Sequence, residues 1–199
     1  KSLAVIAESG GDISDVVINE SLLESNPGQG IAIAGFGQDS TVRNVTVSET
    51  AVLNSSGNGI NVITDSGGVV NGVDVSSVLT ENNTGGFFAY SLSGQIQNVG
   101  ISQFVSTAND NGVTLRTDQG SIDGVEITES AVEQSNAGVS TDGDVSNVDI
   151  NGTILQNNSA TGLEFSDGSS VDTVTVEQTL LQDNGAGLFA HGNVTYTNV

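Results

Sequence analysis

Apart from the carboxylates, few side chains of this sequence could move a proton, and few could hold an anion. Its basic side chains number three, and it has one histidine and two tyrosines. Arg116 follows Tyr90 by 26 positions, and Phe88 lies two positions before that tyrosine. If these residues lay side by side, the tyrosine hydroxyl could transfer a proton on a uronate whose carboxylate the arginine holds. The same groups could instead stack on sugar rings or contact a protein partner.

Acidic residues form a second candidate set. Glu126 and Asp149 fall at equivalent places in neighbouring repeats, and Asp123 and Asp172 belong to the same block. Carboxylates about 5 Å apart repel each other unless a cation lies between them, and Ca²⁺ accepts such oxygen ligands. These four residues are therefore the predicted Ca²⁺ ligands, although no EF-hand loop is present. Further aspartates lie beside turn glycines, where solvated turn residues are the alternative: Asp65, Asp118, Asp142 and Asp167.

The other reactive side chains form no catalytic pattern. His191 is the only histidine, and no Gly-x-Ser-x-Gly element accompanies it, so a Ser/His/Asp triad is not supported. Lys1 is terminal, and Arg43 has neutral neighbours. Cysteine is absent, which excludes thiolate metal sites and thiol nucleophiles. These observations favour a chain that is not an enzyme.

An internal repeat in the sequence predicts the strands on which these residues lie. A glycine followed by an apolar residue recurs every 24 to 29 positions. Each glycine precedes a short alternating stretch, a second block such as 122–127 and a third block such as 130–132. Gly, Asn and Asp separate the blocks, so each repeat reads as three short strands. The glycines are Gly30, Gly59, Gly86, Gly112, Gly138, Gly162 and Gly187.

Such repeats predict an all-β fold, a single-stranded parallel β-helix of about seven coils of roughly 26 residues. Coils stacked at about 4.8 Å align equivalent residues in ladders along the axis. Alternation then places Ile63, Phe88, Tyr90 and Arg116 together on the outer face of the first strand, as a binding or interface patch. No composition change marks a domain boundary within 1–199.

Asparagine usually closes the third block. We expect these side chains to stack and to hydrogen-bond from coil to coil, satisfying backbone groups that a sharp bend would leave unpaired. Seven Asn-x-Ser/Thr sequons also occur, and their glycosylation stays open. The closing asparagines are Asn26, Asn54, Asn82, Asn109, Asn136, Asn158 and Asn184.

The three blocks resemble those of a known family. The Gly-apolar element, the apolar-x-Asn-apolar-x-apolar element at 42–47 and the Ser/Thr-x-Leu/Val-x-x-Asn element are similar to repeats of the pectate-lyase-like superfamily. The resemblance covers nearly the whole chain and implies a right-handed parallel β-helix. For an enzyme it would imply a polysaccharide lyase, which commonly combines Ca²⁺-binding acids with a base, or a glycoside hydrolase. A resemblance to the hydrolases of this fold would imply a Gly-His-Gly element, whereas this sequence has Ala190-His191-Gly192.

Charge excludes several classes of partner. The formal net charge is -21, so nucleic-acid phosphates and anionic lipid surfaces would be repelled. No apolar run approaches the ~20 residues of a membrane span. We therefore expect no nucleic-acid partner and no membrane insertion. Richness in Ser, Thr, Asn and Gly predicts an extracellular or cell-surface location, and the acidic surface suits high salt or divalent cations.

Both ends of the sequence read as uncapped coils. Residues 2–6 already have first-strand character, and 196–199 stop inside a second-strand block. Because a solenoid cut in this way exposes strand edges, the expected partners are copies stacked end to end or the remainder of a longer β-helix. The predicted function is a non-enzymatic structural or adhesive module. The alternative is polysaccharide binding or cleavage by the outer face of the first strand, with glycans as partners.

Overall fold

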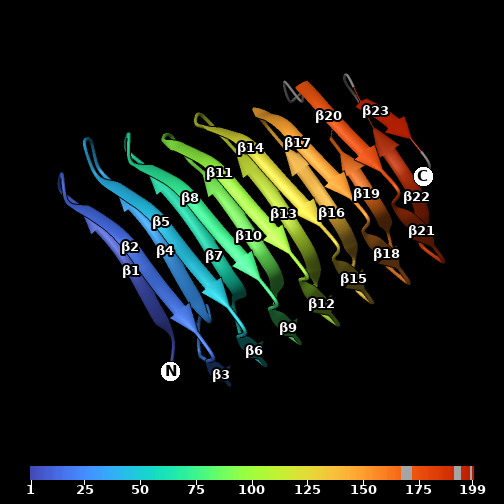
Figure 1. Cartoon of the computed structure of the whole chain (residues 1–199), viewed down its shortest axis with the longest axis horizontal. Helices are drawn as coiled ribbons and strands as arrows, with labels where there is room; N and C mark the ends of the chain where they lie inside the picture. The colour runs from blue at the N-terminus through green and yellow to red at the C-terminus, as the bar shows by residue number, and fades with distance from the viewer. Residues whose placement is uncertain (167–171, 191–193, 198) are drawn as a thin grey trace.

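The chain folds as a parallel β-solenoid, seen in a computed structural model that describes residues 1–166, 172–190, 194–197 and 199. Its 23 described strands form three parallel sheets, and no helix occurs among the described residues. Seven coils each supply one strand to every sheet, and two further strands begin an eighth coil. The predicted all-β fold, coil number and three strands per coil are confirmed. Figure 1 shows the coils following one another along the long axis of the molecule.

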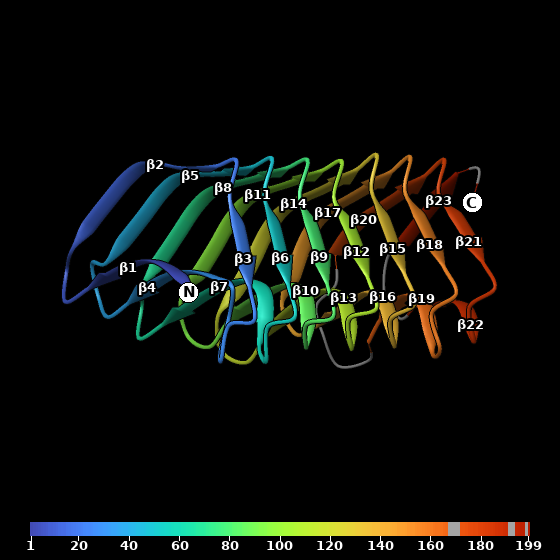
Figure 2. The ribbon, with the colours of Figure 1, turned by 90° about the horizontal axis from the view of Figure 1, so that it is seen from below.

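Sheets A, B and C collect the first, second and third strand of each coil. Sheet A contains β1 (Leu3–Glu8), β4 (Ile31–Phe36), β7 (Asn58–Asp65), β10 (Gly85–Ser91), β13 (Asn111–Thr117), β16 (Ala137–Asp142), β19 (Thr161–Phe165) and β22 (Ala186–Ala190). Sheet B contains β2 (Asp12–Asn19), β5 (Thr41–Ser48), β8 (Val69–Ser76), β11 (Gln95–Ser102), β14 (Ser121–Thr128), β17 (Val145–Asn151), β20 (Asp172–Glu177) and β23 (Val194–Thr197). Sheet C contains β3 (Leu22–Glu24), β6 (Ala51–Leu53), β9 (Leu79–Glu81), β12 (Val105–Thr107), β15 (Ala131–Glu133), β18 (Ile154–Gln156) and β21 (Leu180–Gln182). The short strands of sheet C lie in one row along the rod (Figure 2).

The core fills the inside of the coil with β-branched and aromatic side chains. Alternate residues point inward in sheet A, and in sheet B one bend in the strand interrupts this alternation. The largest fully buried side chains are Phe87, Phe104 and Phe165. In sheet B, an inward column of valines runs through consecutive coils from Val45 to Val174. Stacked β-branched side chains suit a pleated, buried surface. The period-2 pattern of the sequence thus decides which residues enter the core.

Steric contact explains the glycine that opens each repeat. A Cβ on Gly86 would lie 2.7 Å from the carbonyl oxygen of Gly112, and one on Gly112 would lie 2.4 Å from that of Gly138. Equivalent contacts of 2.3 to 2.8 Å occur from Gly30 through Gly162. Because the backbone of each coil approaches the next so closely here, any side chain would push neighbouring coils apart.

Asparagines at the corner between sheets C and A form two columns, which corrects part of the predicted ladder. The buried column contains amides that bridge coils; for example, Asn109 Oδ1 accepts from the Asn83 backbone N–H at 2.8 Å. Asn54 and Asn82 instead occupy the preceding exposed position with φ of 54°, which asparagine tolerates, and Asn136 is also exposed. These three asparagines do bond from coil to coil, since Asn82 Nδ2 donates to Asn54 Oδ1 and Ser159 Oγ donates to Asn136 Oδ1, both at 3.4 Å. They join side chains and do not belong to the buried ladder, because the buried position follows each sheet C strand by two residues and they lie one residue before or after it. The buried column is Asn26, Ser55, Asn83, Asn109, Ser135, Asn158 and Asn184.

Candidate functional site

The register of sheet A brings the predicted patch together. Tyr90 pairs with Ile63 on one side and with Arg116 on the other, and Arg116 pairs with Asp142. Phe88 lies two residues along the same strand, beside Thr114 of the next coil. All of these side chains point away from the core, because the residues between them are buried.

Direct contacts connect these side chains across three coils. The Phe88 and Tyr90 rings lie 5.9 Å apart, tilted by 54°. The guanidinium carbon of Arg116 lies 5.4 Å from the centre of the Tyr90 ring, within range of a cation–π interaction. The Tyr90 hydroxyl donates to Asp118 Oδ2 at 2.6 Å. We call Phe88, Tyr90, Arg116, Asp118 and Asp142 the Tyr90 cluster.

Arg116 is shared between two carboxylates. Its Nη2 lies 3.6 Å from Asp118 Oδ1, and its Nε lies 3.9 Å from Asp142 Oδ2. These side chains are about half exposed, so the ion pairs orient the guanidinium more than they stabilise the fold. The exposed guanidinium could still accept an anionic group of a ligand.

Hydrogen bonding makes Tyr90 a poor base. The bond to the Asp118 carboxylate raises the pKa of Tyr90 above its ordinary value of about 10, with smaller contributions from desolvation and the Asp118 charge, against which Arg116 acts. The phenol therefore stays protonated at neutral pH. A proton-abstracting role for Tyr90, which the sequence left open, loses support, whereas a role as hydrogen-bonding and stacking surface remains compatible with the geometry.

A shallow groove of about 330 Å³ adjoins the cluster. Its lining includes Phe88, Arg116, Asp142 and Glu164, whose carboxylate accepts hydrogen bonds from the Thr161 hydroxyl at 3.1 Å and the Ser166 hydroxyl at 3.3 Å. Glu164 was not singled out from the sequence as a site residue, although the sheet A register places it in the same outward column as Phe88, Thr114 and Ser140.

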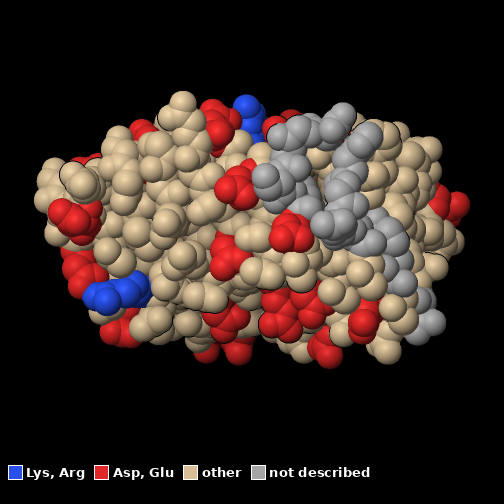
Figure 3. All heavy atoms as spheres, turned by 90° about the horizontal axis from the view of Figure 1, so that it is seen from above, with Lys and Arg blue, Asp and Glu red and all other residues tan. Residues whose placement is uncertain are grey.

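Asp118 is the other group that the predicted patch lacked. It was assigned to the turn aspartates, yet it contacts both Tyr90 and Arg116. Its position two residues after Arg116 was the available signal, because outward side chains alternate along a strand. Figure 3 views the rod from the side of the turns between sheets A and B, where acidic side chains are widespread and basic ones lie at separate places.

The predicted Ca²⁺ ligands divide between two columns of sheet B. Glu126 and Asp149 are register partners in adjacent coils. Asp123 and Asp172 share a second column, but Ser146 lies between them, so they are two coils apart. Among the described residues, no group of three or more His, Cys, Asp or Glu side chains could hold a metal ion. Ca²⁺ binding by the Glu126–Asp149 pair stays a prediction.

A left-handed residue in each of the first seven sheet B strands explains why both Asp123 and Glu126 point outward. Gly124 has φ of 72°, and the bend that it makes leaves two outward positions between buried Ile122 and Val125. Asp123 Oδ1 accepts from Ser146 Oγ at 2.7 Å and from Asn147 Nδ2 at 2.6 Å. These bonds, led by that from Ser146, lower the pKa of Asp123 below its ordinary value. The Asp123 carboxylate therefore already accepts hydrogen bonds from two side chains of the next coil.

The remaining sequence candidates do not assemble into a site. Asp65 accepts hydrogen bonds from the Ser66 backbone and the Ser93 hydroxyl, as a turn residue does. Arg43 pairs with Asp12 on sheet B, far along the chain from the Tyr90 cluster. His191 and Asp167 lie outside the described residues.

Comparison with known proteins supports the same fold. The family model for the right-handed β-helix region matches residues 29–199. The chain belongs to the right-handed β-helix family. The handedness that the resemblance implied is thereby confirmed for this β-helix. No curated protein sequence matches it.

The solved structures that match this chain provide little further information about it. Two structures of trypsin-treated QnrB1, a plasmid-mediated fluoroquinolone resistance protein, are 10% identical to it. They cover 91% and 96% of this chain and 92% of their own, with TM-scores of 0.21 and 0.20. So low a TM-score supports no argument about this chain. Family membership alone does not assign an activity, because function depends on the site that a fold carries.

Proposed function

We propose that this right-handed β-helix is a non-enzymatic structural or adhesive module that acts outside the cell or on its surface. The observation that carries the proposal is the regularity of the coils. Every connection that is described throughout has at most six residues, so no inserted loop walls off a cleft on the described surface. Catalytic residues usually lie on such loops, whereas an uninterrupted ladder makes a rigid rod.

Composition supports the extracellular part of this proposal. The surface is rich in Ser, Thr, Asn and Gly and carries a formal net charge of -21, which keeps a sheet-rich rod soluble. In the described part of the chain, no helix is long and apolar enough to cross a membrane. Protonation of Tyr90 and the absence of cysteine leave the carboxylates as the main groups for covalent or acid–base chemistry.

Edge strands support assembly into longer rods. Sheet A ends at β1 and β22, and sheet B ends at β2 and β23. If β1 of one copy followed β22 of another and β2 followed β23, these two sheets would continue across the junction. Asn26 Oδ1, a buried atom of the first coil, has no hydrogen-bond partner among the described residues. In later coils, the equivalent oxygen accepts from a backbone N–H of the preceding coil, which another stacked coil would supply.

Electron microscopy of the purified chain, with and without Ca²⁺, tests this assembly. Eight strands in sheets A and B predict filaments with an axial repeat of about 38 Å, at about 4.8 Å per coil. Monodisperse short rods at all concentrations and in both conditions would contradict end-to-end stacking. The adhesive part of the proposal would then rest on the faces of the rod alone.

Glycan binding by the Tyr90 cluster is the second candidate. The groove beside Phe88 and Arg116 offers an aromatic face, a cation and several hydroxyls and carboxylates, which suits the ring and polar groups of an acidic sugar. Tyr90→Ala and Arg116→Ala would abolish binding on an array of acidic glycans if this face is the site, and Arg43→Ala serves as the matched control. Retained binding in the first two variants, or no binding by the parent chain, would contradict this candidate. New unsaturated sugar products would instead identify a lyase.

A further inference from the structure

Sheet C carries a continuous row of aliphatic side chains on its outer face. In each three-residue strand the middle side chain is the most buried, whereas the first and third point outward. The registers align all of the first residues in one column. We call this column the aliphatic stripe: Leu22, Ala51, Leu79, Val105, Ala131, Ile154 and Leu180.

The stripe is unusual in its exposure. Between the edge strands of sheet C, Val105 is 42% exposed and Ile154 38%, whereas Ala51, Leu79 and Ala131 are half-buried. Leu22 (67%) and Leu180 (47%) lie on the edge strands themselves, where one neighbouring strand is missing. From the second to the sixth coil, Val105 and Ile154 are the only exposed large apolar side chains among the described residues. The other ones outside the stripe lie in the first and eighth coils, where a neighbouring coil is missing on one side. A contiguous apolar surface along a whole sheet indicates an interaction site.

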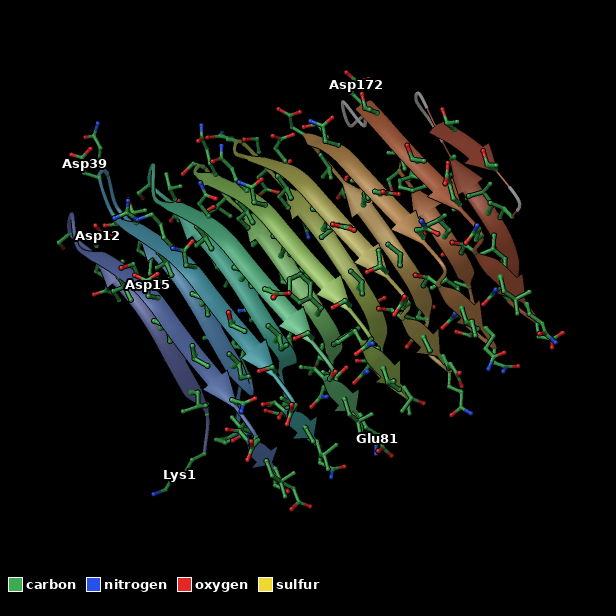
Figure 4. All side chains as sticks on the ribbon, viewed as in Figure 1. Lys1, Asp12, Asp15, Asp39, Glu81 and Asp172 are labelled. Carbon is green, nitrogen blue, oxygen red and sulfur yellow. The ribbon has the colours of Figure 1, made fainter. Side chains whose placement is uncertain are left out.

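Acidic columns border the stripe on both sides. Two residues before it, at the turn from sheet B, lie Glu20, Glu49 and Glu129, and two residues after it lie Glu24, Glu81 and Glu133. The other positions of these columns are neutral, and neither Arg nor Lys occurs in them. Figure 4 shows Glu81 projecting away from sheet C, while Lys1 lies at the beginning of the first coil.

We propose that the stripe binds a cationic amphipathic helix of a partner protein. The apolar face of such a helix would lie along the stripe, and its flanking Lys or Arg side chains would meet the two glutamate columns. Seven coils span about 29 Å between the first and last strands, the length of a helix of about 20 residues. Successive turns of the helix present apolar side chains every ~5.4 Å, close to the ~4.8 Å between coils.

A second copy of this chain fits the stripe less well. Two stripes facing each other would bring glutamate columns together with no basic residue to offset them. The strip, about 29 Å by about 10 Å, would bury a similar area of roughly 300 Å² per partner in either complex, so the charges at its borders discriminate between a helix and a second copy. A helix gains attraction from the same glutamates that repel a copy.

Binding of a synthetic peptide to the full chain tests the proposal. The probe is a labelled helical peptide of about 20 residues with a Leu/Ala face bordered by lysines, and its control is a scrambled peptide of equal composition. Fluorescence anisotropy should show binding of the amphipathic peptide alone, weakened by added salt because the rim contacts are ionic. Val105→Thr with Ile154→Thr should weaken binding by about tenfold, because two apolar contacts are lost.

Matched variants on sheet B control for general effects. Val17→Thr removes another exposed valine outside the stripe, and Asp74→Asn removes an exposed carboxylate on a different sheet; neither should change binding. Glu129→Gln with Glu133→Gln should weaken binding and leave the fold intact, since Glu129 is exposed and Glu133 half-buried on the outer surface.

Three results would overturn the proposal: equal binding of the scrambled peptide, unchanged binding by the stripe variants, or equal weakening by the sheet B controls. A fourth would replace the partner: a dimer in sedimentation velocity that Val105→Thr with Ile154→Thr dissociates. The stripe lies on a different sheet from the Tyr90 cluster, and Val105 and Ile154, which the variants change, lie on interior strands of sheet C, so failure of filament or glycan assays leaves this inference intact.

Discussion

Sheets A and B both stack equivalent residues in ladders, but the ladders around Tyr90 in sheet A and around Glu126 in sheet B bring different kinds of neighbours together. In sheet A, unlike groups are neighbours: the Tyr90 ring meets the Arg116 guanidinium, and Arg116 lies between two carboxylates. In sheet B, Glu126 and Asp149 are neighbours of like charge, and Asp123 is satisfied by Ser146 and Asn147. Because stacking places equivalent residues about 4.8 Å apart, the composition of a column decides whether it attracts or repels.

The two sheets also require glycine for different reasons. Gly112 opens a sheet A strand where a Cβ would lie 2.0 Å from Val132 Cγ1 and 2.4 Å from the carbonyl oxygen of Gly138. Gly124 occupies a left-handed position of sheet B, and Asn98 and Asn147 occupy the equivalent positions of the adjacent coils. Sheet A therefore requires glycine for close approach, and sheet B requires only a residue that tolerates positive φ.

Substituting these two glycines should give the largest effect. Gly112→Ala should destabilise the fold by about 1–3 kcal/mol or more, because the added methyl group overpacks the contact between coils. Gly124→Asn should change stability by less than about 0.5 kcal/mol, because asparagine adopts that conformation elsewhere in the column. Urea unfolding at fixed salt measures both. Similar losses in the two variants would remove the distinction.

Tyrosine titration sharpens the description of sheet A. The hydrogen bond to Asp118 raises the pKa of Tyr90, so its stabilising contribution is present below the ordinary value of about 10 and is lost as pH rises through the folded value. Asp118→Asn should lower the pKa of Tyr90, whereas Asp142→Asn should leave it almost unchanged. Ultraviolet titration in a Tyr196→Phe background isolates Tyr90, since the chain has two tyrosines. Equal changes in the Tyr90 pKa in both variants would mean that the negative charge around Tyr90, and not the hydrogen bond to Asp118, raises this pKa.

A smaller difference is expected in sheet B, where acid unfolding should show that variants of the two acidic columns change stability in different ways. Asp123 has a lowered pKa, so its contribution is present above the ordinary value of about 4 and is lost as pH falls through the folded value. Asp123→Asn should therefore reduce stability at neutral pH more than at low pH. Glu126→Gln should instead raise stability by less than about 1 kcal/mol in low salt, because it relieves repulsion by Asp149. High salt should erase that gain.

The smallest expected effect is that of Ca²⁺ on sheet B. Millimolar Ca²⁺ should raise the thermal midpoint by about 1–2 °C relative to EDTA at equal ionic strength, a shift that corresponds to well under 1 kcal/mol. Glu126→Gln or Asp149→Asn should abolish the shift. Asp123→Asn should retain it, since that carboxylate is bound by Ser146 and Asn147. A shift that survives all three variants would place the cation elsewhere.

The sequence by itself determined the coil, because its signals are local and repeated. The glycine steps gave the coil length, the alternation separated core from surface, and equal spacing aligned Ile63, Tyr90 and Arg116 before any contact was known. Parallel stacking converts a sequence period directly into a spatial neighbour, so a fold of this kind can be predicted from one chain.

Only the tertiary structure decided what happens at the corners. A left-handed residue after each sheet C strand makes the next position, held by Ser55 and Asn83, the buried one, and leaves Asn54 and Asn82 exposed. A bend at Gly124 turned Asp123 outward, and the turn after β13 brought Asp118 to Tyr90. The exposure of Val105 and Ile154 likewise depends on which side of a three-residue strand faces the core. The conformation of each corner depends on individual φ angles and on contacts between coils. The repeat pattern of a single sequence does not specify either of these.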